Sequence, residues 1–292
     1  MIADPLGGRT INIRKEDAKN YMLKISIITV VRNNKRQVEE CINSVLSQNY
    51  ANIEYILVDG DSTDGTLDII KKYEKKISKW ISEPDRGIYD AMNKGIGLAS
   101  GDVVGILNSD DFYTYSDVIA EVMNEFEVRN VDSVFADLVY VKRDDPREMV
   151  RYYESSKFNP DKFVYGLMPA HPTFFLKRYC YEQYGLYRTN YKIAADYELL
   201  LRMFVKKRIS YIHIPKVIVK MRTGGRSTTD LTSTWILNKE IVKACAENGI
   251  KTNYFKVYSK YFTKVFQLFK RPICAGSLVV FLWYNSVIWC NF

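Results

Sequence analysis

Apolar residues in the first half of the chain alternate between short continuous runs and a helical spacing. The continuous runs predict buried strands at Lys24–Arg32, Ile53–Val58, Ile77–Ser82 and Val103–Leu107. Between and after these runs, apolar residues recur at helical intervals, as they do from Val38 to Leu46, which is typical of one buried helix face. Strands and helices that alternate with short connections predict an open α/β sheet with right-handed crossovers.

Polar clusters follow three of these predicted strands. They cover Thr29 to Asn34, Asp59 to Asp64 and Asn108 to Asp111. Ligands of open α/β sheets bind beyond the carboxyl ends of the strands, so we expect the three clusters to meet at one edge. Asp110 and Asp111 are adjacent carboxylates, and a hard divalent cation would relieve their repulsion. The alternative is a solvated turn that caps the next helix.

Beyond residue 130 the pattern is looser. It predicts strands at Ser133–Val141, Glu148–Tyr153, Thr173–Leu176, Ile209–Ile212 and Val217–Met221, and a helix at Tyr197–Lys206. Asp196 precedes this helix and is by default its N-cap, although near a metal ion it would suit a general base. His171 stands alone in an apolar context, where a structural role is the commoner one.

The C-terminal region combines basic and aromatic residues. Between Tyr254 and Arg271, lysines are interleaved with Phe and Tyr, and residues 273–292 carry no charged side chain. This composition predicts a basic amphipathic helix on an anionic membrane surface, followed by an apolar segment that inserts behind it. The alternative is a helix pair that packs on the rest of the chain or on a second copy in a homodimer.

The overall composition is that of a globular protein, because 47% of the 292 residues are hydrophobic and 26% are charged. The net charge of +8 suits phosphate-bearing substrates, anionic lipid or nucleic acid, but no nucleic-acid-binding motif accompanies it. The five cysteines lack metal-ligand spacing, and residues 1–21 lack the apolar stretch of a signal peptide. We therefore expect a cytoplasmic protein with reduced thiols that does not bind nucleic acid.

Several segments together resemble family-2 glycosyltransferases of the GT-A fold. The matching segments are Ile25–Asn33 (ISIITVVRN), Tyr55–Thr66 (YILVDGDSTDGT), Ser82–Asp111 (SEPDRGIYDAMNKGIGLASGDVVGILNSDD), Ala170–Phe175 and Ala195–Arg202. The resemblance implies a Rossmann-like open mixed sheet with helices on both faces and a C-terminal helical tail. It also implies an N-terminal extension (1–22), a nucleotide-sugar-binding half (23–130), an acceptor-binding half (131–230) and a membrane-associating tail (231–292).

The resemblance assigns roles to individual residues. Asp196 falls on the catalytic base of the family, and Asp111 on the position that binds Mg²⁺ or Mn²⁺. The nucleotide sugar would contact Thr29, Val30, Arg32, Asp59, Asp61, Asp85, Arg86, Asn108, Ser109 and Asp110. His171 and Arg222 would lie on the acceptor side. The chain departs from the family pattern at Asn108, where an Asp is usual, and at Ala195, where an acid commonly precedes the base.

These roles imply an inverting transferase of bacterial capsule, exopolysaccharide or O-antigen assembly. It would move one sugar from a nucleotide-diphosphate sugar, by resemblance a UDP-sugar, to a glycan or polyprenyl-linked acceptor at the inner face of the cell membrane. The Arg-Trp motif of processive synthases is absent, which favours a single transfer. The alternative is a non-catalytic nucleotide-sugar or glycan-binding module, but such a protein would be expected to lose Asp111 or Asp196.

Overall fold

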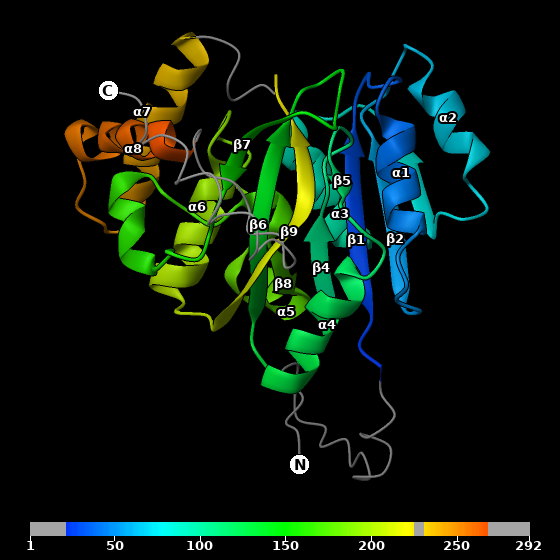
Figure 1. Cartoon of the computed structure of the whole chain (residues 1–292), viewed down its shortest axis with the longest axis horizontal. Coiled ribbons are helices and arrows are strands. Elements are labelled where there is room, and N and C mark those ends of the chain that lie inside the picture. Colours follow the sequence, from blue (N-terminus) through cyan, green and yellow to red (C-terminus); the bar gives the residue numbers. More distant parts are fainter. Residues whose placement is uncertain (1–21, 225–230, 268–292) are drawn as a thin grey trace, which may run out of the picture.

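The computed structural model describes residues 22–224 and 231–267. Its first half contains β1 (Ile25–Val31), α1 (Val38–Leu46), β2 (Ile53–Asp59), α2 (Thr66–Lys72), β3 (Lys79–Ser82), α3 (Ile88–Leu98), β4 (Val103–Ile106), β5 (Phe112–Tyr113) and α4 (Val118–Arg129) (Figure 1). The second half contains β6 (Ser133–Val141), β7 (Met149–Tyr153), 3₁₀ turns at Pro160–Tyr165 and His171–Thr173, β8 (Phe175–Lys177), α5 (Arg178–Tyr184), α6 (Ala195–Leu201), a π-helical turn at Arg202–Lys206, β9 (Tyr211–Arg222), α7 (Leu231–Glu247) and α8 (Tyr254–Gln267).

One mixed sheet runs through both halves of the described chain. Its strand order is β3-β2-β1-β4-β8-β6-β9-β5, and β7 pairs with β6. The strands β1 to β4 are mutually parallel, β8 is antiparallel to both β4 and β6, and β6 is parallel to β9. Consequently β1, β2, β3, β4, β6 and β9 all end at the same edge of the sheet, and this carboxyl edge collects the polar clusters.

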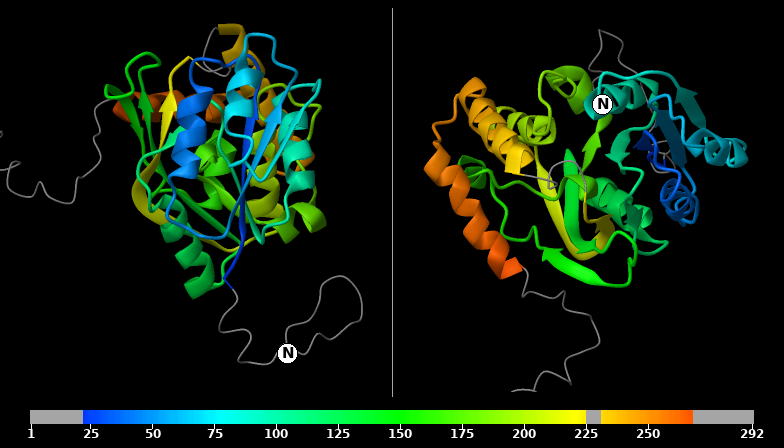
Figure 2. Two further views of the ribbon diagram at one scale, coloured as in Figure 1. Left: turned by 90° about the vertical axis from the view of Figure 1, so that its right-hand side faces the viewer. Right: turned by 90° about the horizontal axis from the view of Figure 1, so that it is seen from above.

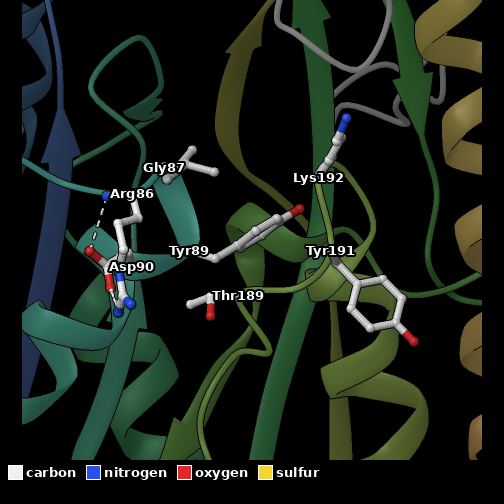
Figure 3. Close-up of a pocket in the computed structure, with 8 residues that line it drawn as sticks. Arg86, Gly87, Tyr89, Asp90, Thr189, Tyr191 and Lys192 are labelled. Atoms are coloured by element: carbon white, nitrogen blue, oxygen red, sulfur yellow. Dashed lines mark hydrogen bonds and ion pairs between the residues drawn. The ribbon is translucent and has the colours of Figure 1, made fainter.

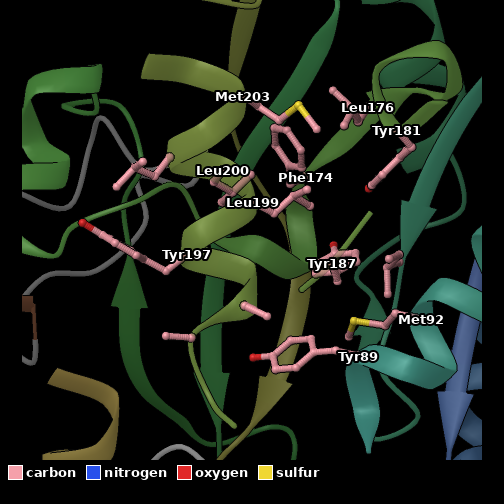
Figure 4. Close-up of a cluster of buried hydrophobic side chains, with 14 of the residues drawn as sticks. Tyr89, Met92, Phe174, Leu176, Tyr181, Tyr187, Tyr197, Leu199, Leu200 and Met203 are labelled. Carbon is pink, nitrogen blue, oxygen red and sulfur yellow. The ribbon is translucent and has the colours of Figure 1, made fainter. Parts of the chain in front are cut away.

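Helices cover both faces of the sheet, as the sequence predicts (Figure 2). One buried cluster packs α1, α2 and α4 against the sheet, and its members include Ile42, Ile70 and Val122. The opposite cluster packs α3, α5, α6 and α7, and Figure 4 shows Tyr89 and Met92 of α3 in one cluster with Tyr187 and with Leu199 of α6. This second cluster joins the first half of the chain to the second half through a shared core, so their relative position is fixed by packing.

Three sequence predictions need correction in the second half. The two strands predicted at Ile209–Ile212 and Val217–Met221 form one strand, β9, because a register shift against β6 accommodates Pro215. The predicted strand Thr173–Leu176 begins two residues later, after a 3₁₀ turn. The helix predicted from Tyr197 begins at Ala195, so Ala194, and not Asp196, is its N-cap.

The two C-terminal helices pack on the domain. Contacts join α7 to α6 and to α8, and α8 also lies against the turn at Pro160–Tyr165. Val257 of α8 is buried in the core cluster that contains α6. The described helices include none with the length and hydropathy needed to cross a bilayer. Residues 268–292, which contain the predicted inserting segment, lie outside the described part of the chain.

Candidate active site

The turn that follows β4 carries two oxygen atoms without partners. Asp111 is fully buried, and its backbone N–H donates to the carbonyl of Asn108 over 3.0 Å. Its Oδ2 lies 3.5 Å from Asn108 Nδ2, whereas Oδ1 of Asp111 and Oδ1 of Asn108 are buried without a hydrogen-bond partner among the described residues. Buried polar oxygens are normally paired, so this turn is suited to a ligand that supplies positive charge.

The electrostatic environment of this turn also favours a ligand that supplies positive charge. Burial raises the pKa of Asp111 well above its usual value, and the neighbouring charge of Asp110 adds to the effect. Arg222, at the end of β9, donates from Nη1 to the Asp110 carbonyl over 2.6 Å and from Nη2 to Glu40. Its guanidinium also lies 4.8 Å from the Phe112 ring centroid. The structure thus places Arg222, predicted on the acceptor side, against the carboxylate turn.

The donor set at this turn fits a hard divalent cation. Carboxylate and amide oxygens are the ligands that Mg²⁺ and Mn²⁺ prefer, and Asp111 and Asn108 both present an unpaired one. No group of three His, Cys, Asp or Glu side chains converges anywhere in residues 22–224 or 231–267. A cation here would therefore take its remaining ligands from phosphate oxygens and water, which is how Mg²⁺ commonly binds beside nucleotides.

Asp59 lies at the end of β2 and is fully buried. Its carboxylate accepts hydrogen bonds from Ser62 N at 3.1 Å, from Ser62 Oγ at 2.5 Å and from Ser82 Oγ at 2.7 Å. These bonds join the ends of β2 and β3. They hold the carboxylate in one orientation at the carboxyl edge.

Arg32, Asp85 and the backbone of Gly60 come together beside Asp59. Arg32 Nη1 lies 4.0 Å from Asp85 Oδ1, which also accepts a hydrogen bond from the Gly87 N–H over 2.8 Å. A Cβ at Gly60 would lie 2.1 Å from Asp85 Oδ2, so any other residue here would displace the Asp85 carboxylate from its present position. The predicted nucleotide residues Arg32, Asp59 and Asp85 therefore share one site.

Other predicted nucleotide residues are placed differently. Thr29 is fully buried, and its hydroxyl lies 3.1 Å from the hydroxyl of Tyr55 on the α1 side of the sheet. Val30 packs in the opposite core cluster. Asp61 is exposed in a left-handed turn with φ of 59°, and the Arg86 side chain is 82% exposed and paired with Asp90. The Thr29 side chain is not accessible to a nucleotide, because it is fully buried.

Ser109 belongs to the carboxylate turn. Its Oγ accepts a hydrogen bond from Asn34 Nδ2 over 3.0 Å, and the Asn34 N–H donates to Thr66 Oγ1 over 2.9 Å. The polar clusters after β1, β2 and β4 are thereby linked directly. The predicted convergence of three strand ends at one edge is confirmed.

Asp196 is the second residue of α6 and is half-buried. Its Oδ1 accepts a hydrogen bond from the Tyr197 N–H over 2.7 Å. Burial raises the pKa of Asp196, and the nearby His171 opposes that shift. His171 is itself buried, with Nε2 at 2.7 Å from the Tyr187 hydroxyl, and burial lowers its pKa. A half-buried carboxylate with a raised pKa is suited to take up a proton.

The segment that leads to Asp196 is held by a residue that the sequence analysis missed. Glu240 of α7 accepts hydrogen bonds from the backbone N–H groups of Lys192 at 2.7 Å, Ile193 at 2.9 Å and Ala194 at 2.9 Å. From the other side, the Tyr89 hydroxyl of α3 donates to the Ile193 carbonyl. Both contacts join residues distant in sequence, so no local pattern could have indicated them.

Tyr140 of β6 lies opposite Arg151 of β7 in the sheet. Burial raises the pKa of its phenol, Arg151 lowers it, and the charges of Asp111 and Asp196 both raise it. One phenol thus lies within electrostatic range of both carboxylates. The Arg151 guanidinium sits 4.0 Å from the Tyr140 ring centroid and has no carboxylate partner among the described residues. The sequence analysis placed these residues on strands but assigned them no role.

A pocket of about 320 Å³ lies beside the segment that precedes Asp196 (Figure 3). It is lined by Arg86, Gly87, Ile88, Tyr89, Asp90, Thr189, Tyr191 and Lys192. Figure 3 shows the Tyr89 ring between the ion pair of Arg86 with Asp90 and the segment that carries Lys192. The pocket therefore joins a loop of the nucleotide half to the segment that leads to the candidate base.

Comparison with known proteins agrees with this arrangement. A match to the family described as glycosyl transferase family 2 covers residues 26–193. A PGL/p-HBAD biosynthesis glycosyltransferase of Mycobacterium bovis is 28% identical over 226 residues, which are 75% of this chain and 82% of that protein. The family match runs from β1 to the segment just before α6.

Two solved structures share the fold. The mannosyltransferase PcManGT of Pyrobaculum calidifontis, in complex with GDP-Man and Mn²⁺, superposes with a TM-score of 0.61 and 21% identity, covering 83% of this chain and 70% of that one. TarS of S. aureus superposes with a TM-score of 0.59 and 16% identity, over 84% of this chain but only 44% of TarS. The fragment TarS 1–349, in complex with UDP-GlcNAc, gives a TM-score of 0.58. These likenesses show a GT-A fold.

Proposed function

The chain belongs to glycosyl transferase family 2, and from this premise we propose that it is an inverting, metal-dependent enzyme of surface polysaccharide biosynthesis. It transfers a single sugar from a nucleotide-diphosphate sugar to a hydroxyl group of a glycan or lipid-linked glycan. One observation carries the proposal: Asp111, at the carboxyl edge of the sheet, is fully buried and one of its carboxylate oxygens has no hydrogen-bond partner among the described residues.

On the donor side, the residues around the carboxyl edge supply the contacts. Asp59 and Asp85, held by the bonds described above, face the nucleoside, and Arg32 offers a positive charge beside them. Asp111 and Asn108 hold Mg²⁺ or Mn²⁺, with Asp110 beside them, and when bound this ion neutralises the diphosphate leaving group. UDP is the nucleotide that we propose, because of the resemblance around Asp59; TarS with UDP-GlcNAc supports the same donor class.

The transfer step is a single displacement. An acceptor hydroxyl attacks the anomeric carbon from the face opposite the diphosphate, and the bond from that carbon to the diphosphate oxygen breaks. Asp196 removes the hydroxyl proton as the new glycosidic bond forms, so the anomeric centre inverts. The raised pKa of Asp196 favours this proton uptake.

We also propose that the enzyme works peripherally at the inner face of the cell membrane, where a polyprenyl-linked acceptor would lie. Two aromatic side chains of α8, Phe255 and Tyr254, are 87% and 50% exposed, and Lys256 beside them is exposed as well. Val257 of the same helix is buried. This helix therefore packs on the domain by one face and offers a basic, aromatic face that suits an anionic membrane surface.

A thermal-shift screen tests the donor site. UDP, GDP, dTDP and CMP are each added with and without Mn²⁺ to the wild-type chain, to Asp111→Asn and to Asp68→Asn. The last variant replaces an exposed carboxylate of α2 and serves as the matched control. We expect one nucleotide to raise the melting temperature only with Mn²⁺, in the wild type and the control but not in Asp111→Asn. If no nucleotide shifts the wild type, the proposed function is wrong.

The alternative, a binding module without catalysis, shares the expected thermal shift. A sugar-transfer assay on the wild type and on Asp196→Asn distinguishes this binding module from an enzyme. A wild type that binds the nucleotide but neither transfers nor hydrolyses its sugar would favour the binding module.

A further inference from the structure

A second and larger hollow lies on the other side of the segment that leads to Asp196. It has a volume of about 530 Å³ and is lined by Lys192, Trp235, Ile236, Lys239, Glu240, Val242, Lys243 and Tyr254. We call it the α7 groove, because most of these residues belong to α7. Lys192 lines both this groove and the smaller pocket beside Tyr89. The groove is therefore continuous with the candidate base segment and distinct from the carboxylate turn.

The α7 groove carries a net positive charge. Three lysines line it, and its one carboxylate, Glu240, is already engaged by three backbone N–H groups. Lys243 lies 3.7 Å from Glu247, whereas Lys192 and Lys239 have no carboxylate within ion-pair distance among the described residues. Two unpaired ammonium groups in one concave surface attract an anion with more than one negative charge.

Aromatic surfaces stand beside these charges. Trp235 is 55% exposed, with Lys239 Nζ at 5.0 Å from its ring centroid, and the half-exposed Tyr254 lies at the start of α8. The Lys243 ammonium lies 4.4 Å from the ring centroid of the buried Tyr191. Exposed aromatic faces beside cations suit a ligand that joins an apolar or sugar portion to a phosphate.

We propose that the α7 groove binds the diphosphate and first prenyl carbons of a lipid-linked acceptor, and so delivers the acceptor sugar to Asp196. This inference rests on the proposed function and names its acceptor class. The shared wall at Lys192 favours an acceptor group over the donor diphosphate, which is assigned to the Asn108–Asp111 turn. The hollow shape favours a discrete diphosphate over the flat array of headgroups in a bilayer.

Binding of geranyl diphosphate tests the groove directly. The titration follows tryptophan fluorescence of the full chain in the presence of EDTA, because a lysine site needs no cation whereas the carboxylate turn does. We expect saturable binding of geranyl diphosphate and none of geraniol, which lacks the phosphates. Trp235→Phe should remove most of the fluorescence change, since this residue lines the groove.

Charge-removing variants sharpen the test. Lys192→Gln combined with Lys239→Gln should weaken binding by at least about tenfold, because two charge-assisted contacts to phosphate oxygens are lost. Lys216→Gln, which removes an exposed lysine paired with Glu121 on the other side of the sheet, is the matched control and should bind normally. A double variant that binds geranyl diphosphate as tightly as the wild type would overturn the proposal.

Two further outcomes are informative. If vesicles containing phosphatidylglycerol bind through these lysines but geranyl diphosphate does not, the groove is a membrane contact and the proposal is wrong. Because the titration uses neither nucleotide nor Mn²⁺, its failure leaves the nucleotide screen untouched. Conversely, a failed nucleotide screen with intact geranyl diphosphate binding would show a lipid diphosphate site without the proposed donor site.

Discussion

Glu54 and Asp111 are buried carboxylates at opposite edges of the same sheet. Glu54 lies at the amino end of β2 and accepts hydrogen bonds from Ser26 Oγ at 2.6 Å, Ser100 N at 2.7 Å and Ser100 Oγ at 2.7 Å, with Lys79 Nζ at 2.9 Å. Asp111 lies beyond the carboxyl end of β4, with Asp110 beside it and one oxygen unpaired. The buried carboxylate at the amino ends of the central strands is therefore fully paired, whereas the one at their carboxyl ends is only partly paired among the described residues.

The pKa values express this difference. Burial raises the pKa of both groups, but at Glu54 the hydrogen bonds from Ser26, Ser100 and Lys79 outweigh burial and hold the pKa well below its usual value. At Asp111 burial and Asp110 act together and raise the pKa. A satisfied buried carboxylate stabilises the fold, whereas an unsatisfied one is retained at the expense of stability, which is typical of functional sites.

The largest expected effect concerns Asp196, which resembles Asp111 in its raised pKa. Asp196→Asn keeps the shape of the side chain but cannot take up a proton. We expect the transfer rate to fall by at least about 100-fold, the usual contribution of a general base, while nucleotide binding is kept. Sugar transfer and the thermal shift with nucleotide and Mn²⁺ measure the two properties. Transfer at nearly the wild-type rate would show that another group is the base.

A smaller effect is expected at Glu240, a satisfied carboxylate that positions the Asp196 segment. In Glu240→Gln the amide NH₂ would face backbone N–H donors, so at least one hydrogen bond is lost. We expect kcat to fall by about tenfold, the cost of roughly one such bond, with an unchanged KM for the donor. The charge of Glu240 also raises the pKa of Asp196, so the acid limb of the kcat profile should move to lower pH.

A control separates this positioning role from general destabilisation. Glu125→Gln removes a carboxylate of α4 that pairs with Arg129 on the surface, and it should change neither kcat nor the pH profile. If Glu240→Gln lowers the melting temperature but leaves the acid limb in place, Glu240 supports the fold without acting on the base.

The smallest effect on activity is expected at Glu54, where stability should change instead. Glu54→Gln leaves buried donors without a charged acceptor, and we expect a loss of about 1–3 kcal/mol in the free energy of unfolding. Exposed pairs contribute little, so Glu148→Gln, which breaks the surface pair with Lys142, is the matched control. Urea denaturation measures both, and equal midpoints for the two variants would contradict the comparison. Donor KM should be unchanged.

The same comparison predicts a pH dependence. Because the folded pKa of Glu54 is depressed, its contribution to stability is complete above the unfolded value of about 4.3 and is lost as pH falls below it. Glu54→Gln should therefore cost more stability at neutral pH than in acid.

The pH dependence expected from Asp111 is the opposite, since its raised pKa lowers stability as pH rises above about 4. Without a divalent cation, Asp111→Asn should unfold no more easily than the wild type at neutral pH.

Much of the site could be read from the sequence, because its parts are local. The apolar runs before Asn33, Asp59 and Asn108 define strand ends, and parallel strands bring such ends to one edge. That logic located the carboxylate turn without any knowledge of packing. The resemblance then distinguished Asp196 from an ordinary helix-start acid, which the pattern alone could not do.

Other parts were decided only by tertiary contacts. The side chain of Thr29 lies in the core, because the alternation of side chains along β1 directs it toward Tyr55. Arg222 lies against the Asp110 turn, because β9 pairs with β5. Glu240 binds backbone groups more than forty residues away in the sequence, so no local pattern marked it.

The sequence by itself therefore determined the alternating elements, the polar strand ends and the carboxylates Asp59 and Asp111 at those ends, because hydrophobic periodicity and strand direction are local properties. Only the tertiary structure decided which carboxylates are satisfied and which are not. That depends on donors brought from distant segments, such as Ser100 to Glu54 and the 192–194 backbone to Glu240, and on their absence around Asp111. Burial and hydrogen-bond partners, which set the pKa and reactivity of each carboxylate, are properties of the packed chain.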